Sequence, residues 1–128
     1  MKKYDYTPEV IRELADNEIF VFGSNLAGMH GGGAARYAYQ HFGAVWGEGV
    51  GLYGQSYAIP TMHGGPNVIK PYVDEFIAFA KQHGELLFLV TPIGCGIAGF
   101  TAREIAPLFR DAVGVDNIVL PESFIKVL

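Results

Sequence analysis

Two glycine-rich segments of this sequence have the composition of phosphate-binding loops. One runs from Gly23 to Gly33 and the other from Ile93 to Gly99, and each lies between an apolar run and a segment with helix-forming spacing. Successive glycines let backbone N–H groups converge, and the N-terminus of the next helix adds free donors and a favourable dipole. A single such loop would be explained by tight turns and close packing. Two in matching places favour a ligand whose pyrophosphate is held from both sides.

Few side chains near these loops suit nucleophilic or acid–base chemistry. Cys95 lies in the second loop, where N–H dipoles would lower its pKa, although a lone thiol among glycines is more often a packing residue. His30 lies in the first loop and is a candidate for proton transfer, with simple solvent exposure as the commoner alternative. The histidines and the single cysteine lack metal-ligand spacing, so the sequence predicts neither a metal site nor a cofactor.

The elements that must position these loops alternate between strands and helices. Short apolar runs predict strands over 19–22, 56–59, 86–90 and 117–120. Helical spacing and capping residues predict helices from Thr7 to about Asn17, over 34–42, over 68–83 with Asn67 as cap, and from Thr101 to Ala112 with Glu104 completing a capping box. The segment from Val45 to Gly54 is read as a loop or an irregular strand. This alternation predicts an α/β fold with a mostly parallel sheet and helices on both faces. The two glycine-rich loops then follow strands, at the edge where such sheets bind ligands.

Composition restricts the class of protein. The 128 residues suit one domain, 1–128, because half are hydrophobic and no linker divides the chain. A formal charge of −4 without a Lys or Arg run argues against nucleic acid as a partner. A single cysteine excludes an internal disulfide, and neither a signal-peptide pattern nor an apolar run of membrane-spanning length is present. We therefore expect a cytoplasmic protein with no membrane association.

A dinucleotide-binding alternative rests on the second loop. Gly94 to Gly99 fits the G-x-G-x-x-G pattern after a strand and before a helix, and Glu122 would be the acid that binds the ribose of NAD. The motif lies near the C-terminus, where little chain is left for a Rossmann half. This NAD-binding Rossmann-like module is the second interpretation. No P-loop is present, since neither stretch ends in Gly-Lys-Ser/Thr.

The residues in and after the two loops carry a resemblance to a known family. Asn25 with Gly31-Gly32-Gly33-Ala34-Ala35, and later Pro92-Ile93-Gly94-Cys95-Gly96-Ile97, resemble the macrodomain family, most closely its terminal ADP-ribose protein glycohydrolase branch. The resemblance extends over Ile19 to Leu120 and implies a three-layer α/β/α fold that binds ADP-ribose. It also implies that the two loops wrap the diphosphate and distal ribose, with Asn25 near that ribose.

Three features of that branch are missing from this sequence. Thr61-Met62-His63 stands where the branch has a catalytic lysine, and Ala98 stands where it has an aspartate. The early Gly-Asp-Ile segment, whose acid reads adenine, is replaced by residues 7–14. The resemblance therefore implies binding more strongly than hydrolysis.

The sequence thus predicts binding of ADP-ribose or a related nucleotide diphosphate, as a free small molecule or on an ADP-ribosylated protein. An ADP-ribosyl hydrolase is the enzymatic alternative, with Asn25 or His30 as the catalytic residue that positions water. The predicted ligand-binding residues are Ser24, Asn25, Gly31, Gly32, Gly33, Ala34, Ile93, Gly94, Cys95, Gly96, Ile97, Gly99 and Phe100.

Overall fold

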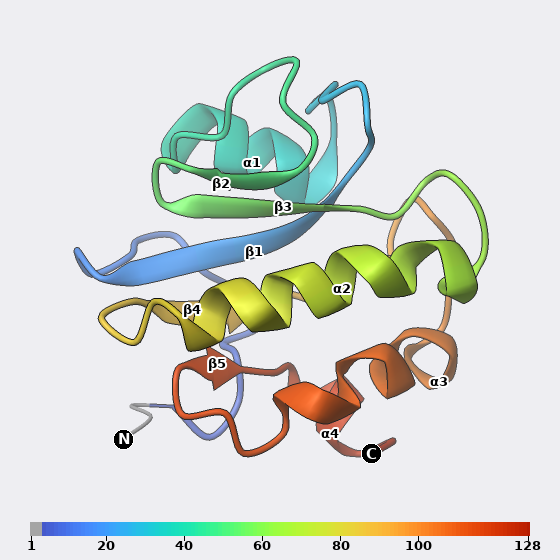
Figure 1. Cartoon of the computed structure of the whole chain (residues 1–128). Coiled ribbons are helices and arrows are strands. Elements are labelled where there is room, and N and C mark those ends of the chain that lie inside the picture. Colours follow the sequence, from blue (N-terminus) through green and yellow to red (C-terminus); the bar gives the residue numbers. More distant parts are fainter. Residues whose placement is uncertain (1–3) are drawn as a thin grey trace.

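A mixed, mostly parallel sheet forms the centre of the protein, and the computed structural model describes residues 4–128 of the chain. Its strands are β1 (Glu18–Ser24), β2 (Gly51–Tyr53), β3 (Ser56–Pro60), β4 (Leu87–Val90) and β5 (Ile118–Val119). They lie in the order β2-β3-β1-β4-β5, as Figure 1 shows from top to bottom. β1 pairs in parallel with β3 and β4, β4 pairs in parallel with β5, and only β2 is antiparallel to its neighbour.

The helices are α1 (Gly33–His41), α2 (Pro66–Lys81), α3 (Ala102–Ile105) and α4 (Glu122–Ile125), and a 3₁₀ helix, η1 (Ala106–Ala112), continues α3. Alternating side chains of β1 belong to two separate apolar cores, since a strand points successive side chains to opposite faces. Ile19 and Val21 pack in a large core with residues of α2, α3, η1 and α4. Phe20 and Phe22 pack in a smaller core with residues of α1. The predicted α/β class is confirmed.

The predicted helix from Thr7 to Asn17 is wrong, because this segment contains no helix. Thr7 does not cap a helix. Its N–H donates to the carbonyl oxygen of Leu120 and its hydroxyl donates to that of Val119, both at 3.0 Å. Hydrogen bonds to the far end of the chain thus replace the local cap that the sequence suggested.

Other boundaries differ in smaller ways. The capping box at Thr101 and Glu104 is confirmed, but the α-helix it opens is short and becomes 3₁₀ near Pro107, which lacks the N–H that an α-helix needs. Asn67 is not a cap, since Gly65 caps α2 and Pro66 occupies its first position. α4 was not predicted from the sequence.

Connections leave the two central strands on opposite faces of the sheet. From β1 the chain passes through α1, in the smaller core, and reaches β2 and β3 on one side of β1. From β4 it passes through α3 and η1, in the larger core, and reaches β5 on the other side. Loops that diverge in this way leave a crevice at the carboxyl ends of the strands. Within residues 4–128, no helix has the length and apolar character needed to cross a bilayer.

Candidate functional site

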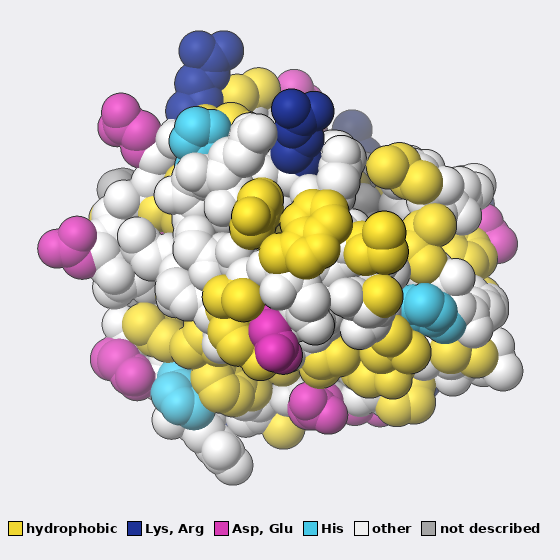
Figure 2. All heavy atoms as spheres, turned by 90° about the horizontal axis from the view of Figure 1, so that it is seen from above, with side chains coloured by type: hydrophobic (Ala, Val, Ile, Leu, Met, Phe, Trp, Pro, Cys, Tyr) yellow, Lys and Arg dark blue, Asp and Glu magenta, His cyan; other side chains and the backbone are white. Residues whose placement is uncertain are grey.

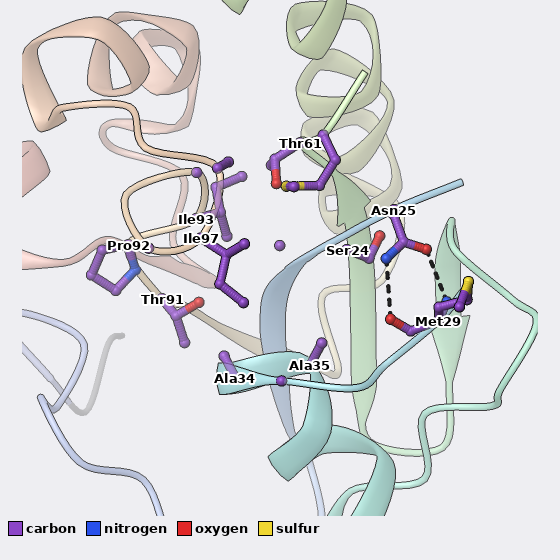
Figure 3. A pocket seen from close by; sticks show the side chains of 17 residues that line it. Ser24, Asn25, Met29, Ala34, Ala35, Thr61, Thr91, Pro92, Ile93 and Ile97 are labelled. Carbon is purple, nitrogen blue, oxygen red and sulfur yellow. Dashed lines mark hydrogen bonds between the residues drawn. The ribbon is translucent and has the colours of Figure 1, made fainter. Parts of the chain in front are cut away.

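A cavity of about 250 Å³ opens at this divergence, where the loops after β1, β3 and β4 meet (Figure 3). We call it the loop cavity. Its lining residues are Gly23, Ser24, Asn25, Met29, Gly32, Gly33, Ala34, Ala35, Thr61, Met62, Thr91, Pro92, Ile93, Gly94, Gly96, Ile97 and Ala98. Both glycine-rich loops therefore border one space, at the edge of the sheet expected from the sequence.

The first loop is closed by the side chain of Asn25. Its Nδ2 donates to the carbonyl oxygen of Met29 at 3.1 Å, and its Oδ1 accepts from the Met29 N–H at 2.8 Å (Figure 3). Gly28, inside this closure, has a φ of +68°, a conformation that favours glycine. Asn25 thus fixes the path that leads to Gly32, the N-cap of α1.

The second loop is closed by its own backbone. The N–H of Phe100 donates to the carbonyl oxygen of Gly94 at 2.8 Å, and the N–H of Gly99 donates to that of Gly96 at 3.0 Å. The loop also approaches the start of α1, because a Cβ on Gly32 would lie 3.3 Å from the Cδ1 of Ile97.

Several backbone N–H groups on the walls of the loop cavity have no acceptor within residues 4–128. Among them are those of Gly33, Ala34 and Ala35 in the first turn of α1, and those of Gly94, Gly96, Ile97 and Ala98 in the second loop. No Lys or Arg side chain lines the cavity. Its affinity for an anion would therefore come from N–H dipoles rather than from cationic side chains.

The loop after β3 is tied to the first loop. The N–H of Leu26 donates to Nε2 of His63 at 2.8 Å, so this ring nitrogen carries no proton. The N–H of Thr61 donates to the carbonyl oxygen of Ser24 at 2.9 Å, which continues the pairing of β1 with β3. Thr61 is therefore held firmly at the cavity wall.

Most of the predicted ligand-binding residues line the loop cavity: Ser24, Asn25, Gly32, Gly33, Ala34, Ile93, Gly94, Gly96 and Ile97. Gly31, Cys95, Gly99 and Phe100 do not. Phe100 instead packs against the large core. Lining residues that sequence analysis did not assign to the ligand are Gly23, Met29, Ala35, Thr61, Met62, Thr91, Pro92 and Ala98. Thr61 directly follows a parallel strand, and that position is a signal that would have identified it.

His30 lies away from the loop cavity and is only 1% exposed. Its Nε2 lies 3.0 Å from the carbonyl oxygen of Val45 and 3.1 Å from that of Glu48, so this nitrogen carries the proton and donates. The ring packs edge-on against Phe22 and Trp46. This placement gives His30 a structural role in joining two loops and does not fit the predicted positioning of water.

Cys95 does not have the lowered pKa that the sequence suggested. Burial raises the pKa of its thiol, and the charge of Glu104 raises it further. A raised pKa leaves less thiolate at neutral pH, and the thiolate is the nucleophile.

We accordingly expect Cys95 to react with iodoacetamide several-fold more slowly at pH 7.5 than a free cysteine does, with a rate that increases as pH rises. Mass spectrometry of timed samples measures this rate. Glu104→Gln keeps a side chain able to complete the capping box and should accelerate the reaction by removing the charge. Alkylation faster than that of free cysteine at the same pH would contradict the raised pKa.

A second cavity, of about 630 Å³, adjoins the first. We call it the N-terminal cavity, since the segment 8–12 forms one wall and Phe20 and Tyr37 contribute to the others. Ala34, Thr91 and Pro92 line both cavities. The two cavities are therefore neighbours, with these three residues between them. Glu122, the acid of the NAD interpretation, lines neither of them.

Exposed hydrophobic side chains extend outward from the first loop. Met29 is 59% exposed, and Tyr39, Val45 and Trp46 are each about half exposed. Figure 2, which looks down on the part of the molecule that carries α1, shows hydrophobic side chains gathered near the middle of that face. Within residues 4–128, no three His, Cys, Asp or Glu side chains come together in a group that could hold a metal ion.

Comparison of the chain with protein-family models, with curated proteins and with solved structures gives no match. The proposals below therefore depend on the residues and geometry of this chain and on the resemblance noted in its sequence.

Proposed function

We propose that this protein binds ADP-ribose or a related nucleotide diphosphate, with the diphosphate in the loop cavity. The observation that carries the proposal is the set of unpaired N–H groups contributed by two loops to one cavity. Such groups at a helix N-terminus and in a loop of successive N–H donors stabilise phosphate oxygens without basic side chains. Gly33, Ala34, Gly96 and Ile97 are exposed, so water can reach these donors in the free protein and a bound anion would replace that water as their acceptor.

The N-terminal cavity supports the choice of a nucleotide. Its volume of about 630 Å³ is within the usual range for small-molecule sites, and Phe20 and Tyr37 give it apolar walls. Glu9 and Arg12 on its rim can hydrogen-bond to a base. A ligand with its base in this cavity passes Ala34 and Pro92 and reaches the loop cavity with its phosphates.

A macrodomain-like three-layer arrangement and a cytoplasmic location belong to the same proposal. Separate apolar cores on the two faces of the sheet support the first. The free thiol of Cys95, which suits a reducing compartment, supports the second. The geometry favours binding over hydrolysis, because the Asn25 amide is bonded to Met29 at both of its polar atoms.

A thermal-shift titration tests this function. ADP-ribose at about a hundred times its dissociation constant should stabilise the fold by about 2.7 kcal/mol, which raises Tm by several degrees. ADP should stabilise it less and AMP least, because each lacks part of the ligand. A larger effect of NAD than of ADP-ribose would favour the dinucleotide interpretation. No shift with any of these nucleotides would refute the proposal.

A further inference from the structure

The floor of the loop cavity contains a hydroxyl group that the protein itself does not use. Three hydroxyl side chains line the cavity. Ser24 donates to the carbonyl oxygen of Gly49, and Thr91 donates to that of Val21. Thr61 is only 4% exposed, and its Oγ1 has no hydrogen-bond partner within residues 4–128. Most polar side chains of buried residues bond to another protein group, so the Thr61 hydroxyl is unusual in being available to a ligand.

The Thr61 hydroxyl is reachable from the cavity. Among the described residues, the one enclosed side-chain nitrogen or oxygen without a partner is Nδ1 of His30. The Thr61 Oγ1, which also lacks a partner, is therefore not enclosed, and the residue lines the loop cavity. Thr61 can both donate to a ligand oxygen and accept from a ligand hydroxyl.

A backbone donor and this hydroxyl both lie close to Gly23. A Cβ on Gly23 would lie 3.2 Å from the Thr61 Oγ1 and 3.5 Å from the Gly94 nitrogen. The Gly94 N–H has no acceptor within the described residues. Because Gly23 has no side chain, the space beside these two polar groups stays open.

The position of Thr61 indicates which part of a ligand it meets. Ala34 and Thr91, which border the N-terminal cavity, lie on the opposite side of the loop cavity from Thr61 (Figure 3). A ligand with its base in the N-terminal cavity and its diphosphate between the two loops therefore directs its remaining end toward Thr61.

We propose that the Thr61 hydroxyl and the Gly94 N–H bind an oxygen of a hydroxylated group attached beyond the diphosphate. This inference rests on the proposed function and extends it. The site selects nucleotide diphosphates that carry a terminal sugar over the bare nucleoside diphosphate. Thr61 is the residue that makes the distinction, and Gly23 leaves the room for it.

Calorimetric titration of ADP-ribose and of ADP into the wild type, Thr61→Val and Thr61→Ser tests this selection. Thr61→Val keeps the shape of the side chain and removes the hydroxyl, and Thr61→Ser keeps the hydroxyl. Thr61→Val should lower the affinity for ADP-ribose by roughly three- to tenfold, as expected for one lost hydrogen bond. It should change the affinity for ADP by less than about twofold. Thr61→Ser should bind both ligands within about threefold of the wild type.

A second variant guards against misfolding of Thr61→Val. Gly23→Ala fills the space beside the two polar groups, at a residue whose backbone conformation suits alanine. It should lower the affinity for ADP-ribose and leave the affinity for ADP unchanged. An equal loss of affinity for both ligands, or no loss of affinity for ADP-ribose, would overturn the role of Thr61 while leaving the proposed function intact. A wild-type protein that binds neither ligand overturns both.

Discussion

Gly32→Glu is expected to reduce the affinity for ADP-ribose by at least a hundredfold while leaving the protein folded. Gly32 has φ −153° and ψ 162°, extended backbone that any residue adopts. A Cβ there would meet only the Cδ1 of Ile97, at 3.3 Å, and a flexible methyl group can move aside. The new carboxylate would lie between the two loops, next to the unpaired N–H groups of the first turn of α1. A unit charge about 4 Å from a phosphate charge costs about 4 kcal/mol at an effective dielectric constant of about 20.

The unliganded variant should be at least as stable as the wild type, since a carboxylate at the start of a helix is favourable. The titration is therefore paired with a thermal scan without ligand. Gly84→Glu is the matched control, because it adds the same charge at an exposed glycine with no atom within 4 Å of its Cβ position. Gly32→Ala separates the effect of size from that of charge and should reduce the affinity for ADP-ribose by less than tenfold. Tight binding of ADP-ribose by Gly32→Glu would mean that the start of α1 does not contact the ligand.

The sequence predicted that the two glycine-rich loops meet at one edge of the sheet, because the relevant signals are local. Apolar runs fix the parallel strands, and glycine-rich segments after two of them must meet at one edge of the sheet. In the structure, β1 and β4 are the strands that precede the two glycine-rich segments, and they lie next to each other in the sheet. No local signal shows which glycines line the cavity and which only close the loop. Gly99, for example, donates its N–H to Gly96 within the loop.

The errors arise where distant parts of the chain decide the structure. Thr7 followed by Pro8 is a sound local helix start, but the hydrogen bonds of Thr7 go to residues more than a hundred positions away. His30 looked exposed because glycines surround it in the sequence. Phe22, Tyr39 and Trp46, from three other segments, close over its ring. Composition near a residue cannot reveal such contacts.

The largest effect on stability is expected from Gly49→Ala, outside the loop cavity. Gly49 lies in the segment 45–50, which packs against the first loop from behind. Its missing Cβ leaves room for the main chain of Asn25, whose carbonyl oxygen would overlap an added methyl group. Backbone atoms cannot turn aside as a side chain does, so the two segments would have to separate.

That separation would break a connected set of hydrogen bonds. The Ser24 hydroxyl donates to the carbonyl oxygen of Gly49, the Gly47 N–H donates to that of Gly28 at 2.9 Å, and the His30 ring donates to the same segment. Overpacking alone costs about 1–3 kcal/mol, and each buried group left unpaired costs about 1–3 kcal/mol more. The free energy of unfolding, measured by urea denaturation, should therefore fall by about 3 kcal/mol or more, a large share of the roughly 5–15 kcal/mol of a typical domain.

Gly84→Ala, at a position with open space around it, should change the free energy of unfolding by less than about 0.5 kcal/mol. Because Asn25 shapes the path to α1, a folded Gly49→Ala protein should also bind ADP-ribose more weakly than the wild type. A free energy of unfolding equal to that of the wild type would mean that the segment 45–50 does not support the first loop.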